Sequence, residues 1–321
     1  MLQTNDPAIP TIEYNVACQG EVNTPPEAVQ PSEFYDIPSQ MEGMAVSRDG
    51  SQVLAGQYNE GILHIYSRNK STGALSGVST LSVDNMDQIY GVQYSRDNRH
   101  VYYTSQSGDG VVVLTRQSNG DLSNTQVITS GTRYLCPINN QVLGQCPIGT
   151  MNGARGIAIS PDDKYVYVTG YADGSLTVLR RNTSTGRLSF LQAITRSIGG
   201  VNVLGGGVRV TTSPDGDYVY VAAYAEDTLA VFKRNDTGRL NLIAAYKDNT
   251  PGFSYLDGPT DVLISPDGNY AYVAARRDNA LSVYARSSAD GQLTFASVIP
   301  DVEGAWGLGM THDNGGKNPG K

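Results

Sequence analysis

The phrase Ser-Pro-Asp-(Gly/Asp)-x-Tyr-x-Tyr-Val recurs along this chain of 321 residues. It reads SPDDKYVYV from Ser160, SPDGDYVYV from Ser213 and SPDGNYAYV from Ser265, and degenerate copies begin at Ser47 and Ser95. The aspartates of all copies, a C-terminal remnant included, stand at Asp49, Asp97, Asp162, Asp215, Asp267 and Asp313. A period of about fifty residues, here with one longer interval, predicts a propeller or a solenoid of repeated units.

One repeat, from Arg155 to Ile194, predicts four short strands, because its apolar residues alternate with a period of two in four places. Pro161 and Asp162 favour a tight turn between the first two strands, and a recurring Thr-Gly-x-Leu phrase favours another between the last two. Such a four-stranded antiparallel meander has two apolar faces, so each unit must stack on its neighbours. A radial ring of blades is the usual solution.

The stretch YVYVTG from Tyr165 nearly reproduces the signature of YVTN-type repeats. From about residue 42 to residue 313 the chain resembles the lactonase-like β-propeller family, which includes 6-phosphogluconolactonase-type enzymes. We therefore expect an all-β propeller with five complete four-stranded blades and a partial sixth. The blades should start near residues 42, 90, 155, 208 and 260.

Residues 1–41 form an N-terminal extension before the first repeat, and residues 314–321 form a C-terminal tail. The extension contains two strand-like stretches, which begin at Thr11 and Ser32. Three outcomes stay open: the extension closes the ring of its own chain, it adds strands to a neighbouring molecule and builds a homo-oligomer, or the chain is a truncated fragment.

Net charge −8 and a pI near 4.9 argue against nucleic acid as a partner, because phosphates demand a basic stripe. No apolar run reaches the length that a membrane span needs, and the opening ten residues do not form a signal peptide. One arginine ends the predicted third strand of each blade, and we expect these side chains to form a solvated rim: Arg68, Arg116, Arg181, Arg234 and Arg286.

Three cysteines occur, Cys18 in the extension and Cys136 and Cys146 in one turn-rich insertion. The spacing of Cys136 and Cys146 favours a disulfide between them over two unpaired buried thiols. With few lysines and many Asn, Ser, Thr and Tyr residues, this pair suggests an extracellular or periplasmic protein.

The loops that lead into the inner strands and the loops between second and third strands are expected to share one face of the propeller. At the starts of the inner strands the chain presents unlike side chains, and we predict a ligand site from Glu42, Tyr90, Arg155, Arg209, Asp261 and Trp306. The arginines would hold an anionic or carbonyl oxygen, Glu42 or Asp261 would act as general base or acceptor, and the aromatic rings would stack on the ligand. The alternative is a set of salt bridges and aromatic plugs that close the channel.

The three histidines share no locus, so we expect no metal site and no cofactor. On sequence alone we favour a secreted or surface binding and assembly module, with a small molecule, glycan or protein on its upper face. The alternative is a hydrolase that opens a sugar or related lactone at the central funnel. The family resemblance implies this chemistry: an arginine polarises the lactone carbonyl and a carboxylate delivers water.

Overall fold

The computed structural model describes residues 40–138, 142–302, 304–305 and 307–308. Their regular structure consists of β-strands, in five four-stranded antiparallel sheets and two short hairpins. The first two sheets are formed by β1 (Met41–Val46), β2 (Gln52–Gln57), β3 (Ile62–Arg68) and β4 (Leu75–Ser82), and by β5 (Ile89–Tyr94), β6 (His100–Ser105), β7 (Gly110–Arg116) and β8 (Leu122–Thr129). The third and fourth comprise β11 (Ala154–Ile159), β12 (Tyr165–Gly170), β13 (Ser175–Arg181) and β14 (Leu188–Ile194), and β17 (Gly207–Thr212), β18 (Tyr218–Ala223), β19 (Thr228–Arg234) and β20 (Leu240–Lys247). The fifth comprises β21 (Pro259–Ile264), β22 (Tyr270–Ala275), β23 (Ala280–Arg286) and β24 (Leu293–Ile299).

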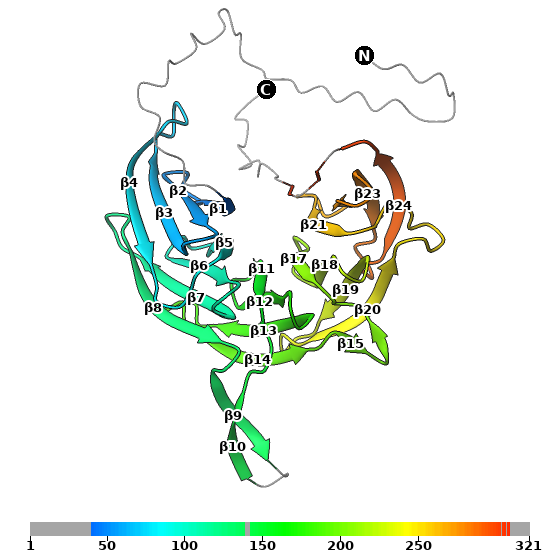
Figure 1. Cartoon of the computed structure of the whole chain (residues 1–321), viewed down its shortest axis with the longest axis horizontal. Helices are drawn as coiled ribbons and strands as arrows, with labels where there is room; N and C mark the ends of the chain where they lie inside the picture. Colours follow the sequence, from blue (N-terminus) through cyan, green and yellow to red (C-terminus); the bar gives the residue numbers. More distant parts are fainter. Residues whose placement is uncertain (1–39, 139–141, 303, 306, 309–321) are drawn as a thin grey trace, which may run out of the picture. The chain divides into compact units, whose positions relative to one another are not determined.

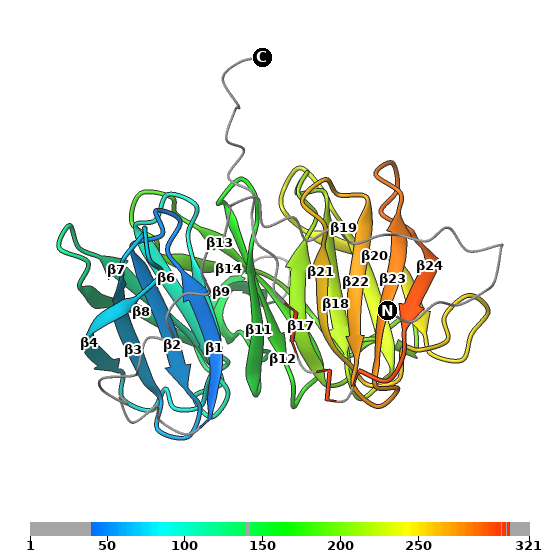
Figure 2. The same ribbon diagram turned by 90° about the horizontal axis from the view of Figure 1, so that it is seen from above.

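These sheets are the blades of a β-propeller, as the repeat predicts. They follow one another around a common centre, with β1, β5, β11, β17 and β21 innermost and β4, β8, β14, β20 and β24 outermost (Figure 1 and Figure 2). The five predicted blade starts are confirmed, since each inner strand begins one residue before its predicted position. The predicted sixth repeat at Asp313 and nearly all of the extension 1–41 lie outside the described residues.

The hydrophobic core lies between the blades. One buried cluster joins Leu54 and Leu63 of the first blade to Val101 and Tyr103 of the second. The other clusters are built in the same way from successive blades. This packing follows from the period of two along each strand, which gives every sheet two apolar faces to bury.

Arginines link successive blades. The arginine that ends the third strand of one blade reaches the aspartate of the Ser-x-Asp turn in the preceding blade. The four pairs, with their nitrogen–oxygen distances, are Arg116–Asp49 (3.2 Å), Arg181–Asp97 (3.5 Å), Arg234–Asp162 (2.9 Å) and Arg286–Asp215 (2.8 Å).

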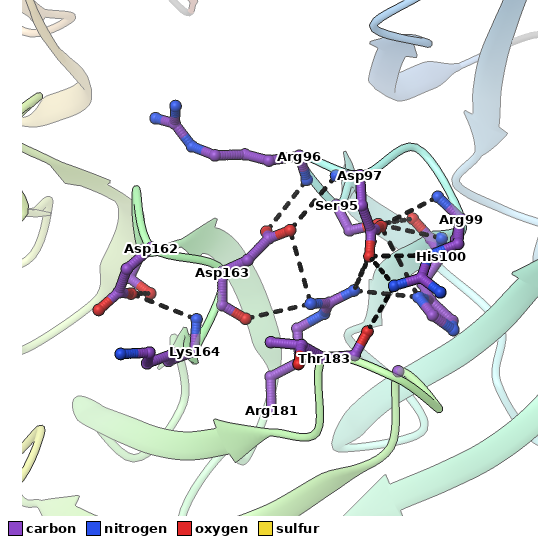
Figure 3. A network of polar contacts seen from close by, with 12 residues as sticks. Ser95, Arg96, Asp97, Arg99, His100, Asp162, Asp163, Lys164, Arg181 and Thr183 are labelled. Carbon is purple, nitrogen blue, oxygen red and sulfur yellow. Dashed lines mark hydrogen bonds and ion pairs between the residues drawn. The ribbon is translucent and has the colours of Figure 1, made fainter.

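The expected solvated rim is therefore wrong. The side chains of Arg181 and Arg286 are 0% and 1% exposed, because the neighbouring blade covers them. Arg181 donates from Nε to the Tyr102 hydroxyl (2.6 Å) and from Nη1 to the Asp163 carbonyl (3.1 Å), and its Nη2 lies 3.0 Å from His100 Nδ1 (Figure 3). The buried guanidinium is thus hydrogen-bonded on all sides, which burial of a charge requires.

The aspartates of these turns are held in their charged form. Burial acts to raise the pKa of Asp97, but hydrogen bonds from Ser95 and Arg99 and the charge of Arg181 outweigh it and hold that pKa well below its usual range. The pKa values of Asp162 and Asp215 are lowered in the same way by their serines and by Arg234 and Arg286.

The insertion with the cysteines forms a hairpin of β9 (Arg133–Ile138) and β10 (Val142–Pro147) (Figure 1). Its register places Cys136 opposite Gly144 and Cys146 opposite Tyr134. The disulfide between Cys136 and Cys146 stays a prediction. A second, shorter hairpin consists of β15 (Ser197–Ile198) and β16 (Val201–Asn202).

The part of the chain that the structure describes contains no helix long and apolar enough to cross a membrane.

Substitution Arg181→Met tests the link between blades. It should lower the free energy of unfolding by about 3 kcal/mol, because it leaves the buried Tyr102 hydroxyl and Asp163 carbonyl without their hydrogen-bond partner and removes the buried one of the two arginines on Asp97. Arg99→Met removes the other arginine on the same carboxylate, whose side chain is 58% exposed, and should cost less than about 1 kcal/mol. Urea denaturation of both variants measures the difference. Equal losses would show that Arg181 is no more important than a surface arginine.

Candidate functional site

Each inner strand carries a β-bulge near its start, where its pairing with the second strand of the blade shifts by one residue. The inner-strand residues between the two pairs where the register shifts are Glu42, Tyr90 with Gly91, Arg155 with Gly156, Val208, and Thr260. Bulges re-aim side chains and are frequent beside active sites. The residues that the sequence singles out at the strand starts thus stand on or beside the irregular positions of the inner strands.

A threonine hydroxyl and a close approach of two backbones hold the bulges of successive blades against one another. The Thr104 hydroxyl accepts a hydrogen bond from the Gly91 amide (2.8 Å) and donates one to the carbonyl of Arg155 in the next blade (2.5 Å). Gly156 approaches the fourth blade so closely that a Cβ there would lie 2.7 Å from the Val208 carbonyl oxygen. The bulges of successive blades are therefore fixed relative to each other, and so are the side chains they carry.

Arg155 is held in an aromatic clamp. Its guanidinium carbon lies 3.5 Å from the centroid of the Tyr171 ring and 4.8 Å from that of Tyr90, within cation–π range. Its Nε donates to Gln106 Oε1 (2.8 Å). Tyr58 meets the Tyr90 ring edge-on, with the centroids 6.4 Å apart. The structure thus brings together the predicted residues Tyr90 and Arg155.

Three residues of this cluster, Tyr58, Gln106 and Tyr171, are not among those predicted from the sequence. Each follows directly after the second strand of its blade, β2, β6 or β12. Aligned on that strand end, the repeats present a large aromatic or polar side chain in every blade: Tyr58, Gln106, Tyr171, Tyr224 and Arg276. The sequence therefore carries a signal for these residues, at a second position of the repeat.

Arg209 and Asp261 form the second part of the site. Arg209 Nε lies 3.7 Å from Asp261 Oδ2, and the Arg209 guanidinium carbon lies 5.9 Å from the Tyr90 ring centroid. Asp261 is 4% exposed and accepts hydrogen bonds from the amides of Val262 (2.8 Å) and Leu308 (2.9 Å). Burial raises the pKa of Asp261, while the charge of Arg209 and the two amides act in the opposite direction.

Of the two remaining predicted residues, the structure describes only Glu42. Glu42 is exposed. Burial is the main cause that raises the pKa of Tyr90, and the charge of Glu42 adds a smaller effect in the same direction. Trp306 lies outside the described residues.

A cavity of about 550 Å³ lies between the inner strands. We call its two ends the ring end, where Arg209 and Asp261 line it with Leu308, and the turn end, where the Ser-x-Asp turns line it. This volume falls in the range of small-molecule sites. Among the described residues no group of three or more His, Cys, Asp or Glu side chains is arranged to hold a metal ion.

The chain belongs to the family described as lactonase, 7-bladed β-propeller, whose model matches residues 36–294 and 235–317. An uncharacterised protein of Lactococcus lactis subsp. cremoris is 24% identical over 254 residues, which cover 78% of this chain and 69% of that protein. The 6-phosphogluconolactonase of Bacillus subtilis is 26% identical over 144 residues, which cover 44% of this chain and 40% of that enzyme.

Solved structures share the fold. A protein from Lactobacillus plantarum superposes with a TM-score of 0.67 at 22% identity and covers 83% of this chain and 73% of its own. The periplasmic gluconolactonase of Pseudomonas aeruginosa superposes with a TM-score of 0.66 at 19% identity, over 84% of this chain and 72% of that enzyme. At these identities the likeness concerns the fold alone.

The Asp261 carboxyl should titrate above the ordinary aspartate range because it is buried. Arg209→Gln should raise the pKa of Asp261 further, since it removes the charge that stabilises the carboxylate. Arg155→Gln removes an arginine of the same cluster that does not contact Asp261, and it should leave that pKa unchanged. Carboxyl carbon NMR shifts recorded against pH measure all three proteins. A pKa of Asp261 that ignores Arg209 would contradict the described ion pair.

Proposed function

We propose that this protein hydrolyses a lactone of a sugar or a related hydroxy acid at the ring end of its cavity. Membership of the lactonase family supports the reaction class. The observation that carries the proposal is the Arg209–Asp261 pair: a buried carboxylate with a raised pKa stands beside an arginine, and both line a cavity of small-molecule size.

Asp261 is suited to the role of general base. A carboxylate has about four lone-pair positions. The amide of Val262 occupies one on Oδ1 and the amide of Leu308 occupies one on Oδ2, while the Arg209 guanidinium faces Oδ2 as an ion pair at 3.7 Å. One position on Oδ1 is left for a water molecule. Burial also makes this carboxylate more basic than an exposed one, which favours proton abstraction near neutral pH.

The reaction then proceeds by addition and collapse. A water molecule gives a proton to Asp261 as its oxygen adds to the lactone carbonyl carbon. The carbonyl oxygen gains negative charge, and the guanidinium of Arg209 donates hydrogen bonds to it. The bond from the carbonyl carbon to the ring oxygen breaks, and the proton moves from Asp261 to that ring oxygen. The product is a hydroxy acid.

Arg155 has a positioning role in this scheme. Its stacking between Tyr90 and Tyr171 and its bond to Gln106 fix the guanidinium, and its terminal nitrogens stay available for an anionic or hydroxyl group of the substrate. The preference for a binding and assembly module, drawn from sequence, gives way to the hydrolase, because the chain belongs to the lactonase family and one of its relatives is a 6-phosphogluconolactonase.

A panel of sugar lactones, with spontaneous hydrolysis subtracted, tests the proposal. Asp261→Asn should lower kcat by about 10²-fold or more by removing the base, and Arg209→Gln should do so by about 10²-fold. For the native protein kcat/KM should rise with pH through the raised pKa of Asp261, because only the ionised carboxylate accepts a proton. Glu60→Gln, an exposed carboxylate of the β2–β3 loop, is the matched control and should change nothing.

Two results would refute the scheme. Full activity in Asp261→Asn with loss of activity in Glu42→Gln would transfer the role of base to Glu42. Saturable binding of the panel without turnover above the buffer rate would favour the binding module.

A further inference from the structure

The turn end of the cavity differs from blade to blade at one position. The residue after the serine of the Ser-x-Asp turn is Pro161, Pro214 or Pro266 in three blades, but Arg48 and Arg96 in the first two. All five residues line the cavity. In two neighbouring blades, a long and positively charged arginine side chain thus stands where the other three blades have an uncharged proline.

These cations have no carboxylate of their own in the cavity. Its charged lining residues are Arg48, Arg96, Arg209 and Asp261. Asp261 lies at the ring end and pairs with Arg209. Partial burial and the positive charge of Arg96 lower the pKa of Arg48, while the Asp163 carboxylate acts in the opposite direction. The cavity therefore carries an excess of positive charge in a protein whose net charge is −8.

The Asp163 carboxylate, whose charge acts on Arg48, is already engaged by other groups. Asp163 accepts hydrogen bonds from the backbone amides of Arg96 (3.0 Å) and Asp97 (3.3 Å), and Arg181 Nη1 lies 3.5 Å from its Oδ2. Figure 3 shows the Arg96 side chain extending away from Asp163, with no contact drawn to its guanidinium. Asp163 thus fixes the backbone of Arg96 and leaves the guanidinium available.

The backbone of Arg48 is anchored in a similar way. Its amide donates to Asn98 Oδ1 of the following blade (3.0 Å). Both arginines therefore start from fixed points on adjacent turns, and both are exposed residues that line the cavity. A planar guanidinium on each side matches the geometry of a tetrahedral or planar oxyanion.

We propose that Arg48 and Arg96 bind a small oxyanion, phosphate or carboxylate, at the turn end of the cavity. An anion bound there attracts both guanidinium groups and offsets their mutual repulsion. The site is separate from the ring end: Asp261 is the third residue of β21 and Pro266 stands in the turn that follows its last residue, Ile264, so the strand alone separates the two ends by about 10 Å at the rise of about 3.3 Å per residue. A small lactone at Asp261 does not reach it.

Isothermal titration calorimetry tests the site directly, with inorganic phosphate in one arm and acetate, a carboxylate that is not a product of sugar lactone hydrolysis, in the other at constant ionic strength. The native protein should bind at least one of the two in a 1:1 ratio. Arg48→Gln and Arg96→Gln should each weaken binding about tenfold or more, because each removes a charge-assisted bond. Arg48→Lys and Arg96→Lys keep the charge and should weaken it less. The preferred anion tells a phosphate site from a carboxylate site.

Two control variants show whether a loss of binding is specific to the turn end. Arg239→Gln removes one positive charge from an exposed turn outside the cavity and should leave binding unchanged. Arg209→Gln at the ring end should also leave it unchanged. The proposal is overturned if neither anion binds, if Arg239→Gln weakens binding as much as Arg48→Gln, or if the loss follows Arg209 alone. Since the readout is binding, its outcome is independent of lactone hydrolysis.

Discussion

The arginine that crosses from each blade to the turn of the preceding one is the interaction on which the propeller depends. Apolar faces alone would let neighbouring sheets slide, since their contacts are non-directional. A guanidinium bonded to a turn aspartate, as in the Arg286–Asp215 pair, fixes one register between two blades. The cost of burying that charge is offset only when its partners are in place. In the described part of the chain Asp267 of the fifth blade has no arginine partner, and Arg68 of the first blade has no aspartate partner.

Fixed blades place unlike side chains at defined positions on the inner strands. The bulges turn these positions out of the regular ladder, and Gly91 and Gly156 allow the backbones of neighbouring blades to approach there. Function in a repeat fold is then found where a repeat departs from its own pattern. At the ring end the departures are Arg209 and Asp261, which occupy the places that glycine holds in earlier blades. At the turn end they are two arginines in place of prolines.

The strands, turns and blade starts could be predicted from the sequence because each depends on residues close together in the chain. The region of the site could be predicted as well, and Tyr90, Arg155, Arg209 and Asp261 do come together. The prediction failed for Arg181, whose burial depends on Asp97, a residue 84 positions away in another blade. Tyr171 was not predicted for a related reason: its ring contacts Arg155, which stands in a β-bulge of another strand, and the pattern of the repeat does not show which side chain a bulge residue meets. Contacts between repeats are not encoded in the pattern of one repeat.

The role of Asp261 and Arg209 as the reacting centre of a lactonase-type propeller can be tested by a crystal structure. The protein would be crystallised with a sugar lactam, which resembles the lactone but resists hydrolysis. We expect the lactam carbonyl oxygen within hydrogen-bond distance of the Arg209 guanidinium, with a water molecule between its carbonyl carbon and Asp261 Oδ1. A lactam bound elsewhere on the propeller, with Arg209 and Asp261 still paired and no water molecule bound to Asp261, would contradict this role.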